Sequence, residues 1–144
     1  MDLFEHDSLE FMFSRVIKLY HHRLHKLLNK IGLYKGQPFI LFTLAENDGI
    51  TQKELAEKIQ LKAASISVMI RRMEKVGLVE RKGDRDDLRI SRVYLTAKGS
   101  NILGIVEGKM KILQQKCFQG FTPEEKLLLR RFFLQISENL SEPE

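Results

Sequence analysis

The 144-residue sequence has a single cysteine, Cys117, which excludes an internal disulfide framework and fits a reducing compartment. It also lacks any apolar run near the ~20 residues that a membrane-spanning helix needs, so we expect no membrane partner. Residues 1–5 do not join a basic start to an apolar stretch, as a signal peptide would. These absences predict a cytoplasmic protein, with Cys117 a small buried or half-buried helix residue.

Sequence signatures of catalysis are absent as well. The chain has no G-x-S-x-G element, no phosphate-binding Walker loop and no dinucleotide-binding fingerprint. We therefore expect that the protein is not an enzyme and that it works without a cofactor. Its net charge of +5 suits a polyanionic partner if the basic residues gather on one surface.

Helix-starting signals divide the chain into elements. Asp7, Thr51 and Thr122 each precede a glutamate by three positions, the spacing of a capping box that satisfies free backbone N–H groups. Apolar residues at three- and four-residue steps then predict helices. The expected helical ranges are 7 to about 32, 37–47, 51–60, 63–76, 96–118 and 122–140. In the second range the apolar residues lie nearly all round, which predicts a central core helix.

The periodicity changes after the fourth helix. Residues 78–82 and 89–95 are alternating, β-branched runs on either side of a charged turn, which predicts a two-stranded hairpin. Three helices followed by a β-hairpin is the order of the winged helix-turn-helix, whose second short helix enters the major groove. We predict a mainly α (α+β) fold of this type, flanked by long terminal dimerisation helices.

The predicted domain organisation follows from this order. Residues 37–95 form the DNA-binding domain, with the helix-turn-helix at about 51–76 and the wing at about 78–95. Residues 1–36 and 96–144 supply the N- and C-terminal parts of a helical dimerisation region.

Positive charge concentrates in the predicted motif. Residues 61–92 contain nine basic and five acidic residues, and therefore hold +4 of the net charge of +5. The apolar positions of the fourth helix leave Lys62, Ser65, Val68, Arg71 and Arg72 on its outward face. Short hydroxyl groups and arginines on such a face suit contacts with phosphates and base edges. An arginine-bearing hairpin tip suits a narrow minor groove.

Several segments in this order resemble the MarR family (multiple antibiotic resistance regulators). The resemblance lies in residues 55–59, 66–67, 73–81, 93–96 and 121–125. It implies a dimer with interlocked terminal helices that binds a palindromic operator in double-stranded DNA, usually relieved by a small ligand. It also implies which residues meet DNA. The residues at or beside the major groove would be Lys62, Ala63, Ser65, Ser67, Val68 and Arg71. The residues of the wing would be Arg85 and Arg89.

Three residues depart from the family's usual pattern. Leu88 replaces the first arginine of the wing motif D-x-x-D-R-R, which leaves open whether Arg85 or Arg89 enters the minor groove. Val68 stands where the recognition helix often has arginine, and can touch only a thymine methyl group. Gln60 stands where a glycine is frequent, so the turn is expected to form without its usual residue of positive φ.

Apolar stripes on the first, fifth and sixth helices exceed what a small core can cover, which predicts a homodimer. The stripe residues are Phe11, Leu19, Ile102, Ile105, Val106, Ile112, Leu113, Leu127, Leu128, Phe132, Phe133, Ile136 and Leu140.

Two further sites and one rival function remain open from the sequence. Basic groups near the end of the first helix, beside the apolar second helix, suit a hydrophobic anionic effector, with His21, His25, Phe39 and Phe42 as pocket candidates. Since His21 and His25 lie one helical turn apart, they are also candidates for a regulatory metal site. The rival function is a winged helix that binds only proteins.

Overall fold

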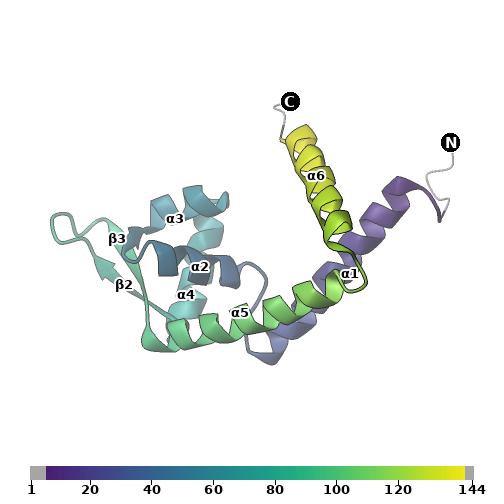
Figure 1. The fold of residues 1–144 in the computed structure, drawn as a ribbon. Coiled ribbons are helices and arrows are strands. Elements are labelled where there is room, and N and C mark those ends of the chain that lie inside the picture. Colours follow the sequence, from purple (N-terminus) through teal and green to yellow (C-terminus); the bar gives the residue numbers. More distant parts are fainter. Residues whose placement is uncertain (1–5, 142–144) are drawn as a thin grey trace. The chain divides into compact units, whose positions relative to one another are not determined.

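The computed structural model describes residues 6–141, so residues 1–5, on which the signal-peptide expectation rests, lie outside it. The chain forms two compact units, residues 1–110 and 111–144. Figure 1 shows the order of the elements. They are α1 (Leu9–Lys30), α2 (Gln37–Glu46), β1 (Ile50–Thr51), α3 (Gln52–Ile59), α4 (Ala63–Lys75), β2 (Val79–Gly83), β3 (Ser91–Leu95), α5 (Ala97–Cys117) and α6 (Pro123–Leu140).

Two of the three predicted capping boxes are confirmed, at Thr51 of α3 and at Thr122 of α6. The third prediction was wrong. Ser8 caps α1, because its Oγ accepts the backbone N–H of Phe11 at 3.2 Å. The helix therefore begins one residue later than a cap at Asp7 would require.

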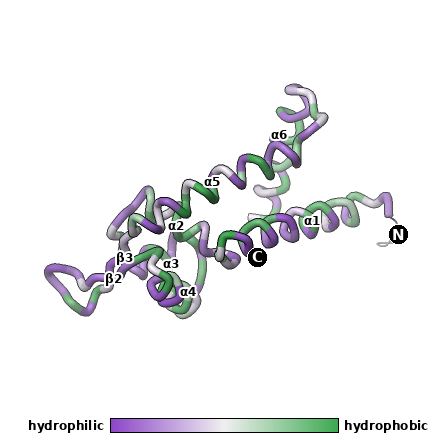
Figure 2. The backbone as a smooth tube through the Cα atoms, turned by 90° about the horizontal axis from the view of Figure 1, so that it is seen from below, coloured by the Kyte–Doolittle hydropathy of each residue, from purple (hydrophilic) through white to green (hydrophobic). Residues whose placement is uncertain are grey.

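The core of the first unit lies between α2, the helix-turn-helix and the sheet. Helix α2 buries Ile40, Leu41 and Leu44 completely, and the tube in Figure 2 is hydrophobic along this helix. The prediction of a core helix, drawn from apolar residues nearly all round α2, was wrong at Phe39, which is 60% exposed. Val106 of α5 belongs to this core, so it is not a surface residue left for a second chain.

The sheet has three antiparallel strands in the order β1-β3-β2. The predicted hairpin is present as β2 and β3, with Val79 opposite Leu95 and Gly83 opposite Ser91. Strand β1 was not predicted, because two residues are too few to show an alternating pattern. It pairs Ile50 with Val93 and joins the base of the hairpin to the end of α2.

The second unit consists of the end of α5 and helix α6. The ring centroids of Phe118 and Phe121 lie 6.3 Å apart across the turn. Gly120 in this turn adopts a φ of 87°. No residue of α6 is buried within the chain. Cys117 is exposed, contrary to the prediction of a buried or half-buried residue. Among residues 6–141, no helix is long and apolar enough to cross a membrane.

Candidate nucleic-acid interface

Helix α4 is held against the core by one face. Ile66, Ile70 and Met73 recur at steps of three and four residues, and each is completely buried. This anchoring leaves the opposite face of α4 in solvent. The helix begins after Lys62, which makes no side-chain capping hydrogen bond. The first backbone N–H groups of α4 therefore have no side-chain partner, and such groups favour anions.

The residues expected to meet DNA in the major groove all lie on α4 or at its N-cap. We call this set the recognition face: Lys62, Ala63, Ser65, Ser67, Val68, Arg71 and Arg72. All are exposed except Ser67, which is half-buried. The structure thus gathers them on one helix, and the exposed fraction of Val68, 42%, leaves its methyl groups available for contact.

The turn before α4 has an unexpected conformation. Gln60 adopts φ 59° and ψ 42°, in the left-handed region. It is the only non-glycine residue with positive φ among residues 6–141. The expectation that this turn would form without a residue of positive φ was therefore wrong. Backbone hydrogen bonds hold the turn, including Leu61 N–H to the carbonyl of Ala56 at 3.1 Å. This geometry sets the direction in which α4 leaves α3.

An ion pair fastens the hairpin to α4. Arg81 of β2 donates from Nη2 to Glu74 Oε1 at 3.0 Å and from Nε to Oε2 at 3.2 Å. The side-chain hydrogen bond from Arg81 lowers the pKa of Glu74, and the same bond raises the pKa of Arg81. Arg81 therefore joins two elements of the site.

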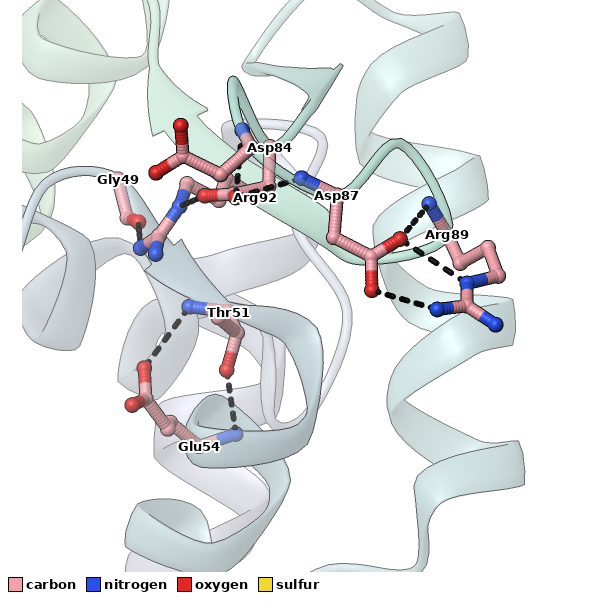
Figure 3. A network of polar contacts seen from close by, with 8 residues as sticks. Gly49, Thr51, Glu54, Asp84, Asp87, Arg89 and Arg92 are labelled. Carbon is pink, nitrogen blue, oxygen red and sulfur yellow. Dashed lines mark hydrogen bonds and ion pairs between the residues drawn. The ribbon is translucent and has the colours of Figure 1, made fainter.

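The residues that connect β2 to β3 form the wing loop, residues 84–90. Figure 3 shows its polar contacts. Arg89 is 91% exposed in its side chain and forms a two-pronged contact with Asp87, from Nε to Oδ1 at 3.0 Å and from Nη2 to Oδ2 at 3.2 Å. This hydrogen bonding lowers the pKa of Asp87. Arg85, the other predicted wing residue, is exposed.

Sequence reasoning gave no role to Arg92, although the structure places it at the centre of this network. Its Nε donates to Asp84 Oδ1 at 2.5 Å and its Nη1 to the carbonyl of Gly49 at 2.9 Å. Asp84 also accepts the backbone N–H groups of Asp86 and Asp87 at 3.1 Å. The only sequence signal was the inward–outward alternation of β3, which puts Arg92 on the face opposite buried Val93.

The residues proposed for an effector or a metal lie away from the recognition face in sequence. His21 and His25 are exposed on α1, and His25 Nε2 lies 3.2 Å from the side-chain nitrogen of Asn29. Phe42 packs against the core, whereas Phe39 is largely exposed. In residues 6–141, no group of three or more His, Cys, Asp or Glu side chains is arranged to hold a metal.

A shallow cleft lies at the turn after α2. It is lined by Asn47, Asp48, Gly49, Ile50, Glu54, Glu57, Lys58 and Arg92. None of the four effector candidates belongs to it.

Comparisons with known proteins agree with the fold. The model of the MarR family matches residues 33–91, which include the helix-turn-helix and most of the wing. The HTH-type transcriptional regulator YybA of Bacillus subtilis (strain 168) is 26% identical over 76% of this chain and 73% of that protein. The HTH-type transcriptional repressor IacR of Pseudomonas putida is 27% identical over 88% of this chain and 76% of that protein.

The crystal structure of the transcriptional regulator SlyA matches with a TM-score of 0.75 and 27% identity, over 90% of this chain and 94% of that one. The matched family, the relatives and SlyA are transcription regulators and not enzymes, and together with the helix-turn-helix and its β-wing they define the class of this protein as a DNA-binding transcription regulator. Within that class, the segment of residues 33–91, which carries the helix-turn-helix and most of the wing, resembles the MarR family.

Proposed function

We propose that the protein is a repressor that binds a pseudo-palindromic operator as a homodimer in the cytoplasm and is released by a small hydrophobic anion. The observation that carries this proposal is the recognition face. Helix α4 is anchored to the core through Ile66, Ile70 and Met73. It presents Arg71 and Arg72 of the recognition face to solvent. A rigid helix with an exposed basic face is what major-groove binding requires.

The homodimer is supported by apolar surface that the single chain leaves uncovered. On α6, Leu128, Phe132 and Phe133 are 51%, 45% and 47% exposed. On α1, Phe13 and Val16 are 42% and 60% exposed. Exposed apolar side chains of this kind, present on each unit by itself, mark an interface, and a second copy of the chain would bury them. A two-fold dimer would present two α4 helices to successive major grooves, about 34 Å apart.

Repression is supported by the name of one relative, IacR, which is described as a transcriptional repressor. The effector proposal is supported by chemistry. His21, His25 and Lys26 are exposed on α1, and Phe39 of α2 exposes an aromatic ring. Together with Phe42, these groups suit a ligand that joins an aromatic ring to an anionic group. Such a ligand releases DNA only if it prefers the released conformation.

Capture of genomic DNA by the purified protein, followed by sequencing, tests the proposal. We expect enrichment of sites with two inverted half-sites. On these sites Arg71→Ala should weaken binding by about 1–3 kcal/mol if Arg71 reads a base edge, and by less if it holds a phosphate. Lys116→Ala, at an exposed lysine of α5 outside residues 61–92, is the matched control and should leave affinity unchanged.

The effector arm uses salicylate, titrated against the captured complex while protein melting is followed. Loss of DNA binding together with a raised melting temperature supports relief by an anion. A melting shift without release of DNA would contradict that part of the proposal. Failure to enrich any duplex would favour the alternative of a winged helix that binds only proteins.

A further inference from the structure

The charge of the wing loop differs from that of the elements around it. Three aspartates and two arginines give residues 84–90 one net negative charge. One of these arginines, Arg89, is already paired with Asp87. The positive charge of residues 61–92 therefore lies on α4 and on strands β2 and β3. An electrostatic contact between the tip and DNA phosphates is weak in this arrangement.

The loop is nevertheless held in one conformation by hydrogen bonds within it. Asp84 N–H donates to the carbonyl of Ile90 at 2.8 Å, and Ile90 N–H donates to the carbonyl of Asp87 at 3.0 Å. Arg92 holds the Asp84 carboxylate from outside the loop. A loop ordered before it meets its partner loses little conformational entropy on binding.

Leu88 lies within this ordered loop. It is 84% exposed, more than any other large apolar side chain in the part of the chain described. One edge of the side chain lies against Gly83, where an added Cβ would come within 3.0 Å of Leu88 Cδ2. Leu88 is not part of α1, α5 or α6, whose exposed apolar residues the proposed dimer would cover.

We propose that Leu88 is a DNA-contacting residue, which enters the minor groove as an apolar wedge beside the site read by α4. Leucine is among the side chains that proteins insert between base steps, and the groove floor is most open to it where no guanine amino group projects. The two strands that end at the loop bring basic residues Arg81 and Lys82 to the same hairpin. Because these two residues are paired with Glu74 and Glu80, the attraction to phosphate comes from the exposed Lys62, Arg71 and Arg72 at the N-cap and on α4. Leu88 supplies the apolar contact. This inference rests on the proposed function, because it names a contact within the same complex.

The test uses the duplex recovered by genomic capture. Hydroxyl-radical footprinting locates the base pairs that the wing protects. Three duplexes are then made in which these pairs are all A·T, all inosine·cytosine or all G·C. Inosine·cytosine lacks the minor-groove amino group of G·C but differs from A·T in the major groove, so it separates readout of the two grooves.

We expect the unaltered protein to bind the A·T and inosine·cytosine duplexes alike and the G·C duplex about tenfold more weakly. Leu88→Ala should weaken binding to the first two by about tenfold and lose this discrimination. Because no charge changes, the slope of log affinity against log salt should stay the same. Val76→Ala, at an exposed apolar residue outside the loop, is the matched control and should behave as the unaltered protein.

Circular dichroism melting shows whether each variant is folded. Equal affinity of Leu88→Ala and the unaltered protein on all three duplexes would overturn the inference while leaving the proposed function intact. An equal loss on all three, or a shallower salt slope, would also overturn it, because the contact would then not be an apolar one in the minor groove. If the unaltered protein does not prefer the captured duplex to a scrambled one, it is the proposed function that fails.

Discussion

Arg92 on β3 donates its Nε–H to Asp84 Oδ1 at 2.5 Å, and this contact ties the wing loop to the central strand of the sheet (Figure 3). The same guanidinium donates to the carbonyl of Gly49, the residue before β1. A single side chain therefore links the wing to the turn that follows α2. In this account Arg92 orders the wing, and contact with DNA is left to its neighbours.

Replacing Arg92 should loosen the wing without unfolding the protein. In Arg92→Ala, the Asp84 carboxylate loses its partner, so we expect faster hydrogen exchange at the backbone amides of Asp86 and Asp87, which donate to it. Nuclear magnetic resonance or mass spectrometry measures this exchange. Arg85→Ala, at an exposed arginine of the same loop, is the control and should leave it unchanged. Unchanged exchange in Arg92→Ala would show that the ion pair does not order the loop.

The contact also predicts a dependence of stability on pH. The hydrogen bond from Arg92 lowers the pKa of Asp84 below its ordinary value of 3.8. A carboxyl group with a lowered pKa in the folded state stabilises the fold above its unfolded pKa, and this contribution is lost as the pH falls through the folded value. The difference in melting temperature between the unaltered protein and Asp84→Asn should be constant from pH 7 to about 5. It should shrink as the pH falls below the ordinary aspartate pKa of 3.8. A difference that grows on acidification would contradict the assignment.

The left-handed conformation of Gln60 predicts a stabilising substitution. Gln60→Gly should raise the free energy of unfolding by up to about 1 kcal/mol, because glycine adopts positive φ without the steric cost that a Cβ brings. Urea denaturation measures the change. Gln60→Ala keeps the Cβ and serves as the control, which should show no such gain. If glycine destabilises the protein by the same amount as alanine, Gln60 is not strained in the native turn.

The apolar face of α6 predicts the effect of a charge placed on it. Phe133→Asp should shift the protein from dimer to monomer, since the aspartate would be buried without a partner in the proposed interface. Sedimentation velocity measures the state of association. Gln135→Asp adds the same charge at an exposed polar position of α6 and should leave the dimer intact. A stable dimer of Phe133→Asp would place the interface elsewhere.

The parts of the structure that local sequence determines could be predicted. The caps at Thr51 and Thr122 need only residues three positions apart, and the exposed side of α4 follows from the spacing of Ile66, Ile70 and Met73. The wing hairpin was found for the same reason.

The features that were missed depend on distant or unusual contacts. Strand β1 exists because Ile50 pairs with Val93, which is 43 residues away. Arg92 acts through Gly49, at a similar separation. The positive φ of Gln60 could not be predicted from its type, because a glutamine seldom adopts that conformation.

The central claim is that α4 and the wing bind a specific DNA duplex, and one measurement tests it most directly. Fluorescence anisotropy gives the dissociation constant for the captured duplex and for a scrambled duplex over a series of salt concentrations. We predict a clear preference for the captured duplex and an affinity that falls steeply with salt, with each neutralised phosphate contributing about −0.9 to the log–log slope. Equal dissociation constants for the two duplexes, or an affinity that does not change with salt, would contradict the account.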